Sequence, residues 1–328
     1  MSAAELAVNL CGGVALLLWG VRMVRKRVER AFGERLNAAV EICARGRARG
    51  FFVGAGLAGA LQSSAAAALI VASFAERGLV PGAAALALVL GADVGSSLVV
   101  QALSFRIPWL APLLIAAGGL AFALSKSRRM RNIARAVLGV GFVLLALHMI
   151  MAASEPLRES AAIVGALRAL ESAPLLAFFL AALLTWLAHS SVAIVLMIAS
   201  LAAGGVIGLP LALALVLGAN LGGAIVPAAL TLHGQAPAAR VGLGNLFMRG
   251  AGAFAALWFV PLIMPFLLLA DDGPARAVVN LHLAFNLGLA ILFLPFVGPV
   301  SKLTEWLIRD REGSDAASLA DIEFRSHS

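Results

Sequence analysis

One apolar stretch with a polar interruption occurs twice in this chain, at 54–101 and again at 181–228, in constant register and without a gap. In the first copy, the polar residues 62–64 precede a glycine-rich segment at 91–97. In the second copy, residues 189–191 precede the segment 218–224 at the same spacing. The same octapeptide, ALALVLGA, runs into both glycine-rich segments. We infer an internal duplication in which each half carries polar residues inside apolar surroundings.

The composition places this duplication in a membrane. Apolar residues make up 62% of the chain and charged residues 13%, and the mean hydropathy is +0.98. Soluble domains are nearer half apolar and a quarter charged. Several apolar stretches approach or exceed the roughly 20 residues that cross a bilayer core. Because strand-like alternation is absent, an outer-membrane barrel is disfavoured. We therefore predict an all-α polytopic membrane protein with the lipid bilayer as its surroundings.

Charge and cysteine content exclude other classes. The net charge of +8 lies in loops, where it indicates membrane orientation and not a nucleic-acid partner. Cys11 and Cys43 form neither a metal-binding spacing nor a disulfide framework. The apolar N-terminal stretch lacks a basic leader and a clear cleavage site, so we expect a retained span and not a signal peptide.

The apolar segments predict seven spans and two interrupted stretches. A basic amphipathic stretch at 25–50 is too charged to cross and is expected at the cytoplasmic surface. A mixed polar connector is expected at 154–173. The spans are expected at 6–24, 81–104, 108–124, 136–153, 209–232, 243–270 and 277–300, and the interrupted stretches at 51–75 and 174–203.

Charge decides how the interrupted stretches lie in the bilayer. If residues 51–75 crossed it, the basic clusters at 22–49 and 126–135 would face opposite sides. If this stretch enters and returns as a re-entrant hairpin, both clusters, the Arg240 loop and the C-terminal tail face the cytoplasm, as the positive-inside bias requires. We therefore expect an inner-membrane protein with its N-terminus outside and its C-terminus in the cytoplasm.

Each half then has three spans and one hairpin, and this odd number of spans gives two inverted-topology repeats. Irregular backbone at membrane depth needs protein or a water-filled cavity around it. The two hairpin tips should therefore meet at the membrane midplane. The expected units are repeat 1 at 1–127, repeat 2 at 128–272, a final span at 273–300 and a cytoplasmic tail at 301–328.

The tips carry groups that suit a small oxyanion. Ser63 and Ser190 stand where a half-helix can begin, and serine is a favourable N-cap. A helix N-terminus offers free N–H groups and positive dipole charge to an anion. The expected substrate-binding residues are Gln62, Ser63, Ser64, His189, Ser190 and Ser191.

The glycine-rich segments suit a cation. If they break the helices at Gly91–Gly95 and Gly218–Gly222, they free carbonyl oxygens that could hold sodium. Asp93 is an acidic residue deep in a span, where function is the default explanation. The one candidate for an intramembrane Lys or Arg partner is Arg249 in the later spans, and this pairing is not convincing from sequence, so a transported cation is the expected partner. The expected sodium-binding residues are Gln62, Asp93, Ser96, Ser97 and Asn220, with no other metal and no cofactor.

These residues resemble a known family. Gln62-Ser63-Ser64 and the 91–97 segment look like the QSS and GANxGTT signatures of the type II sodium/phosphate cotransporters. Residues 12–22 resemble that family's opening span, and residues 280–286 resemble its late HxxFN motif. The resemblance covers about residues 6–300. It implies sodium-coupled uptake of inorganic phosphate, with both tips at the substrate.

The chain departs from the family pattern at several positions. His189 replaces a Gln, and Asp93 replaces an Asn that Asn220 keeps. Serines stand for the two threonines in the first copy, and Gly223-Ala224 loses both hydroxyls in the second. Around residues 240–249, which resemble the other HxxFN region, Asn245 stands for His and Arg249 for Asn.

Three classes of function remain open at this stage. The first is a secondary transporter for phosphate, or for another small anion or with proton coupling. The second is a passive channel or scaffold, and a homodimer is one open assembly state for either. The third, an intramembrane hydrolase using Ser190, His189 and Asp93, is disfavoured. Its adjacent His and Ser are poorly placed as base and nucleophile, and no nucleophile elbow is present. We therefore do not expect an enzyme.

Overall fold

A computed structural model describes residues 3–42, 46–105, 107–269 and 273–310, and within these ranges the chain forms helices and no strands. In chain order the helices are α1 (Ala3–Ile42), α2 (Arg47–Leu61), α3 (Ser64–Glu76), α4 (Gly82–Leu103), α5 (Leu110–Leu124), α6 (Arg128–Ala152), α7 (Glu155–Glu159), α8 (Ala161–Glu171), α9 (Pro174–Ala188), α10 (Ser191–Ala203), α11 (Leu209–Thr231), α12 (Ala236–Asn245), the π-helical segment η2 (Leu246–Gly250), α13 (Ala251–Leu257), α14 (Val260–Leu269), α15 (Pro274–Phe293), the 3₁₀ turn η3 (Leu294–Phe296) and α16 (Val297–Leu307).

Five helical segments in the described ranges are long and apolar enough to cross a membrane. They cover residues 5–27, 82–103, 128–159, 209–231 and 274–307. Two further pairs, α8 with α9 and α12–α13 with α14, are bent by 104° and 80°, and counting each pair as one span gives seven. The predicted class, an all-helical multi-pass membrane protein, is confirmed. The inversion of the repeats, the re-entrant hairpins and the orientation of the termini stay predictions.

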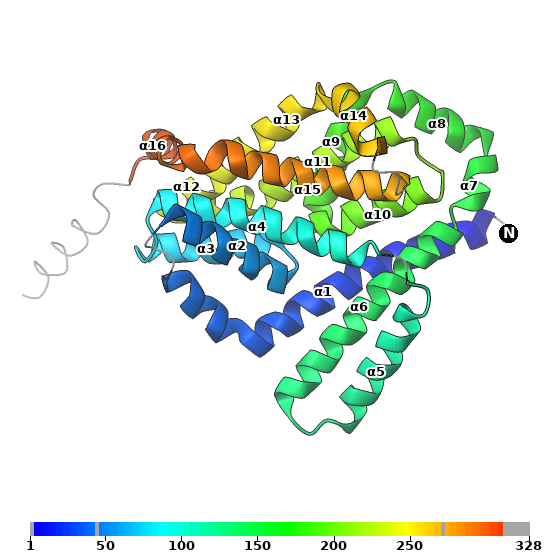
Figure 1. Cartoon of the computed structure of the whole chain (residues 1–328), viewed down its shortest axis with the longest axis horizontal. Coiled ribbons are helices and arrows are strands. Elements are labelled where there is room, and N and C mark those ends of the chain that lie inside the picture. The colour runs from blue at the N-terminus through cyan, green and yellow to red at the C-terminus, as the bar shows by residue number, and fades with distance from the viewer. Residues whose placement is uncertain (1–2, 43–45, 106, 270–272, 311–328) are drawn as a thin grey trace, which may run out of the picture.

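Helices α4 and α11 form the centre of the molecule. Their most apolar windows are 78% and 72% buried, against 28–39% for the other three candidate spans. Figure 1 shows α4 running alongside α15 through the middle, with α5 and α6 projecting to one side. Large apolar side chains such as Leu124, Phe266 and Ile291 remain exposed on the outer helices, as expected for a surface in contact with lipid. The central helices carry several of the buried polar residues, namely Asp93, Ser96 and Ser97 on α4 and Asn220 and Thr231 on α11.

The duplication is visible in the local structure. Helices α2, α3 and α4 begin at Arg47, Ser64 and Gly82. The corresponding helices α9, α10 and α11 begin at Pro174, Ser191 and Leu209, so the offset between the two copies is the same at all three helix starts. In both copies the first helix packs against the third. The repeat detected in the sequence therefore has one structural plan of helix, tip, helix, turn and long central helix.

The glycine-rich segments do not break their helices, and this expectation was wrong. Helix α4 runs unbroken through Gly91 and Gly95, and α11 runs unbroken through Gly218 and Gly222. A Cβ atom on Gly91 would overlap the carbonyl oxygen of Phe51, and one on Gly218 would overlap the corresponding oxygen of Phe178. The glycines allow α2 and α9 to approach the central helices closely, as small residues do at membrane helix crossings.

The basic stretch predicted at 25–50 continues α1 as far as Ile42, because its Arg, Lys and Glu residues favour helix and it contains no proline. Its location at the cytoplasmic surface stays a prediction. The span predicted at 243–270 is not one straight helix, because it bends by 80° between α13 and α14. Pro261 lacks an N–H for the helical ladder, which accounts for the bend. Residues 311–328 of the predicted tail lie outside the described residues.

Candidate functional site: the helix tips and the buried Arg249 network

The two tips have matching backbone conformations. Helix α2 ends at Gln62 and α9 ends at His189, each in the left-handed region with φ of 52° and 54°. Left-handed residues other than glycine are uncommon and often mark functional segments. The following serine is extended in both copies and caps the next helix. The Ser63 hydroxyl accepts from the Ala66 N–H at 3.1 Å, and the Ser190 hydroxyl accepts from the Ala193 N–H at 3.2 Å. The N-caps predicted at both serines are therefore present.

The tips share one small cavity. It is lined by Gln62, Ser63, His189, Ser190 and Ser191, together with apolar residues and Gly223 of α11. Five of the six predicted substrate-binding residues are therefore brought together. The N-terminal ends of α3 and α10 lie at this cavity, where their free N–H groups and dipoles favour an anion. Ser64, the sixth, is buried beside the cavity and bonds to a different partner.

That partner is Arg249, which forms an ion pair in the interior. Its Nη1 donates to Asp93 Oδ1 at 2.5 Å and to Ser64 Oγ at 3.1 Å. Arg249 is 1% exposed and Asp93 is 2% exposed. Asp93 thus already has a cationic partner within the protein. A transported cation at this carboxylate would have to bind beside Arg249 or in exchange for it.

Asn220 of α11 is the second anchor of the guanidinium. Its Oδ1 accepts from Arg249 Nη2 at 2.9 Å, from Arg249 Nε at 3.3 Å and from Asn286 Nδ2 at 3.2 Å. Its Nδ2 donates to the Val216 carbonyl at 2.9 Å and lies 3.1 Å from His282 Nδ1. The side chains of Asn220, Arg249, His282 and Asn286 are all buried. The first and second copies therefore meet through Asp93 and Asn220, on opposite sides of one arginine.

The other predicted sodium ligands have mixed surroundings. The Ser96 hydroxyl donates to the Asp93 carbonyl and the Ser97 hydroxyl donates to the Val94 carbonyl, so both oxygens keep lone pairs. Asp93 Oδ2 and Gln62 Oε1 are buried without a hydrogen-bond partner in the described part of the chain. A hard cation would satisfy such oxygen atoms. These side-chain oxygens are therefore suitable sodium ligands. The free backbone carbonyls expected from broken helices are not present in the described stretches of α4 and α11.

Arg249 was not among the site residues predicted from sequence. It lies in the π-helical segment η2, and π-helical turns are frequent at functional sites. The sequence signal was its position in a stretch resembling the HxxFN motif, where it replaces Asn. His282 and Asn286, from the other such stretch, join the same network. No local pattern assigns these side chains to one cluster.

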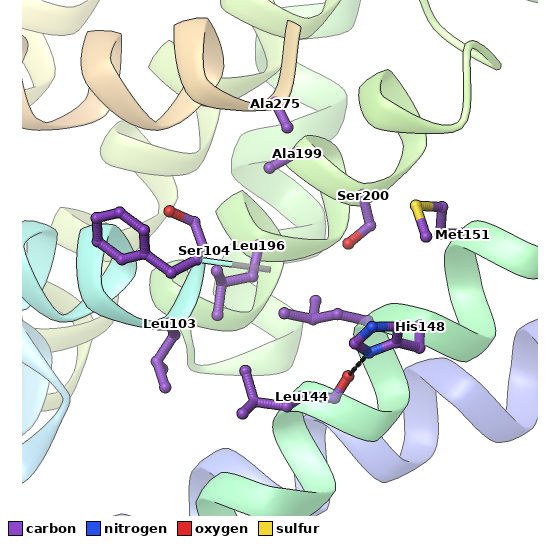
Figure 2. Close-up of a pocket in the computed structure, with 11 residues that line it drawn as sticks. Leu103, Ser104, Leu144, His148, Met151, Leu196, Ala199, Ser200 and Ala275 are labelled. Atoms are coloured by element: carbon purple, nitrogen blue, oxygen red, sulfur yellow. Dashed lines mark hydrogen bonds between the residues drawn. The ribbon is translucent and has the colours of Figure 1, made fainter. Parts of the chain in front are cut away.

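A different cavity, between α4, α6, α10 and α15, has the wrong chemistry for an anion. Figure 2 shows it lined mostly by apolar side chains, such as Leu103 and Leu196. Its His148 lies with Nδ1 2.8 Å from the Leu144 carbonyl one turn earlier in the same helix.

Comparison with known sequences identifies relatives over most of the chain. The profile of the Na+/Pi-cotransporter family matches residues 16–152 and 158–295. A protein of Escherichia coli strain K12, named "Putative inorganic phosphate export protein YjbB", is 36% identical over 308 residues, which are 94% of this chain and 57% of that protein. Its Salmonella typhimurium counterpart is 34% identical over 311 residues. The chain therefore spans little more than half the length of these relatives.

A more distant relative has nearly the same length. YqeW of Bacillus subtilis, an uncharacterized protein, is 24% identical over 295 residues, which are 90% of this chain and 96% of that protein. No solved structure matches the chain.

Proposed function

The chain belongs to the Na+/Pi-cotransporter family, and from this premise we propose that it is a secondary transporter that carries inorganic phosphate with sodium by alternating access. The observation that carries the proposal is the shared cavity of the two tips. Two capped helix N-termini and several hydroxyl groups surround it. This donor set suits the oxygens of a small tetrahedral anion better than it suits a reacting centre. A transporter, and not an enzyme, is also what the family and the relatives indicate.

The proposal extends to the repeats and the coupling ion. Repeat 1 (residues 1–127) and repeat 2 (128–272) would enter the membrane with opposite orientation, so that each tip is exposed to one side in turn. Sodium would bind through Asp93 Oδ2 and Gln62 Oε1, two buried oxygens that lack partners among the described residues. Ser96, Ser97 and Asn220 on the central helices would complete the site.

Uptake under an inward sodium gradient is the proposed direction. A carrier runs either way according to the gradients across it, so export is a second candidate. The name of the Escherichia coli and Salmonella relatives as phosphate export proteins favours it. Influx and efflux measured from the same vesicles, with sodium and membrane potential set independently, would separate the two.

Labelled phosphate uptake into proteoliposomes tests the proposal itself. We expect saturable uptake that falls at least about tenfold when sodium is replaced by choline. Ser191→Ala should weaken uptake, because it removes a hydroxyl from the cavity. Ser172→Ala is the matched control, because this exposed serine lies just after α8, outside the cavity, and donates to the Ala169 carbonyl. Uptake that is non-saturable, or equal with and without sodium, would favour a passive pore or another coupling ion.

Asp93→Asn tests the cation site separately. A carboxylate adds full negative charge to a hard-cation site, which the amide does not. We expect the half-saturating sodium concentration to rise about tenfold or the Hill slope to fall by one ion. The measurement is the sodium dependence of uptake, normalised to correctly folded protein. An unchanged midpoint and slope would remove Asp93 from the set of sodium ligands.

A further inference from the structure

A guanidinium group lies directly behind the wall of the tip cavity. Gly223 lines that cavity, and a Cβ atom on it would lie 3.4 Å from both Nη1 and Nη2 of Arg249 and 3.3 Å from Ser191 Cβ. Residue 223 therefore lies both in the lining of the cavity and beside the guanidinium, and it has no side chain to occupy the space next to Arg249. Its neighbour in the network, Ser64, directly follows the capping Ser63 of the first tip. Arg249 therefore bonds to Ser64 next to the first tip and lies beside Gly223, which lines the cavity shared by both tips.

The donors of this guanidinium are not all used. Arginine has five N–H donors. The Nη1 donors go to Asp93 and Ser64, while Nε and Nη2 each donate to Asn220. The second N–H of Nη2 has no acceptor in the part of the chain that the structure describes. One donor therefore remains for a ligand, and more would become available if Asp93 changed partner.

The ion pair is held by one oxygen of the carboxylate. Asp93 Oδ1 accepts from Arg249, whereas Oδ2 is buried without a partner among the described residues. Arginine and carboxylate frequently pair through two parallel hydrogen bonds instead. An unsatisfied buried oxygen is costly, and a cation would satisfy it. Asp93 is therefore arranged to exchange a protein cation for one from solution.

We infer that Arg249 is a phosphate-binding residue of the transporter. Asp93 holds its guanidinium while the carrier is empty, and sodium at Asp93 releases it to the phosphate oxygens. This inference rests on the proposed function. Separating a buried pair with no replacement partners is strongly destabilising, but here each charge gains a new partner as it loses the old one. Sodium and phosphate would then strengthen each other's binding by the same factor.

Phosphate titrations of the purified full chain in detergent, with and without sodium, test the inference. In the wild type, sodium should tighten phosphate binding about tenfold or more. Gly223→Ala places a methyl group against the Arg249 guanidinium and Ser191 at the cavity lining, and it favours helix, so the variant should fold. We expect phosphate binding about tenfold weaker in Gly223→Ala. Gly288→Ala, which has open space around its Cβ, is the matched control.

A second variant removes both charges. Arg249→Met combined with Asp93→Asn should bind phosphate about ten to one hundred times more weakly and should no longer respond to sodium. Arg240→Gln is the control: it removes a positive charge from the preceding helix α12, where the arginine pairs with Asp310 near the C-terminal end of the described chain. It should leave the phosphate affinity and its response to sodium unchanged.

A purely structural arginine predicts a different result. The folded double variant would then bind phosphate with wild-type affinity, and this outcome overturns the inference. If the double variant does not fold, Gly223→Ala decides, and an unchanged phosphate affinity there also overturns it. Failure of the proposed function is distinct, because the wild type itself would then neither bind nor transport phosphate.

Discussion

Arg249→Met is expected to lower the free energy of unfolding by about 3 to 5 kcal/mol, because it leaves the Asp93 carboxylate buried without its cationic partner. Asp93 is 2% exposed, so water cannot replace the guanidinium. The loss of the guanidinium costs less at Asn220, because its Oδ1 keeps the hydrogen bond from Asn286 Nδ2. Thermal or denaturant unfolding of the purified full chain in detergent measures the loss.

A double variant separates the loss of stability caused by the unpaired charge from the loss caused by the changed side-chain packing. Adding Asp93→Asn to Arg249→Met should recover most of the lost stability, because no charge then remains buried. Arg240→Met is the matched control and should cost less than about 1 kcal/mol, since its partner Asp310 is exposed. If the double variant is as unstable as Arg249→Met alone, the cost comes from lost packing and not from the unpaired carboxylate.

The tips could be predicted from sequence because their signals are local and repeated. A serine that caps a helix accepts from the N–H three residues later, so Ser63 and Ser190 could be assigned without tertiary information. The constant offset between the copies pairs Gln62 with His189, and the structure gives these two residues the same left-handed conformation. The duplication supplied what a single chain otherwise lacks, which is a second example of the same site.

The interior ion pair could not be predicted in the same way. Asp93 and Arg249 are 156 residues apart in sequence, and neither lies in a pattern that specifies the other. The family motif has Asn at the position of Arg249, so the resemblance did not predict a positive charge at the site. Only the packing of η2 against α11 brings the guanidinium to Asn220 and, across it, to the first copy.

The glycine-rich segments were misjudged for a different reason. Glycine in an apolar run is compatible with a broken helix and with a close helix crossing, and the sequence favours neither. The one-turn spacing of Gly91 and Gly95, repeated at Gly218 and Gly222, belongs to the crossing. Its function is to bring the helices that end at the tips close to the helices that carry Asp93 and Asn220.

Gly91→Ala is therefore expected to destabilise the protein by about 3 kcal/mol, at the upper end of the usual cost of overpacking. The added Cβ would overlap the Phe51 carbonyl oxygen, which is backbone and cannot move aside as a side chain can. Alanine gains about 1 kcal/mol of helix propensity over glycine, which is too little to offset the overlap. The measurement is again unfolding of the full chain in detergent.

Gly119→Ala in α5 is the matched control, because nothing lies within 4 Å of its Cβ, and it should be neutral or slightly stabilising. Gly91→Ala should also impair phosphate uptake by more than its loss of folded protein explains, because separating α2 from α4 moves Gln62 and Ser63 relative to Asp93. A Gly91→Ala variant as stable as the wild type would mean that α2 does not pack so closely against α4.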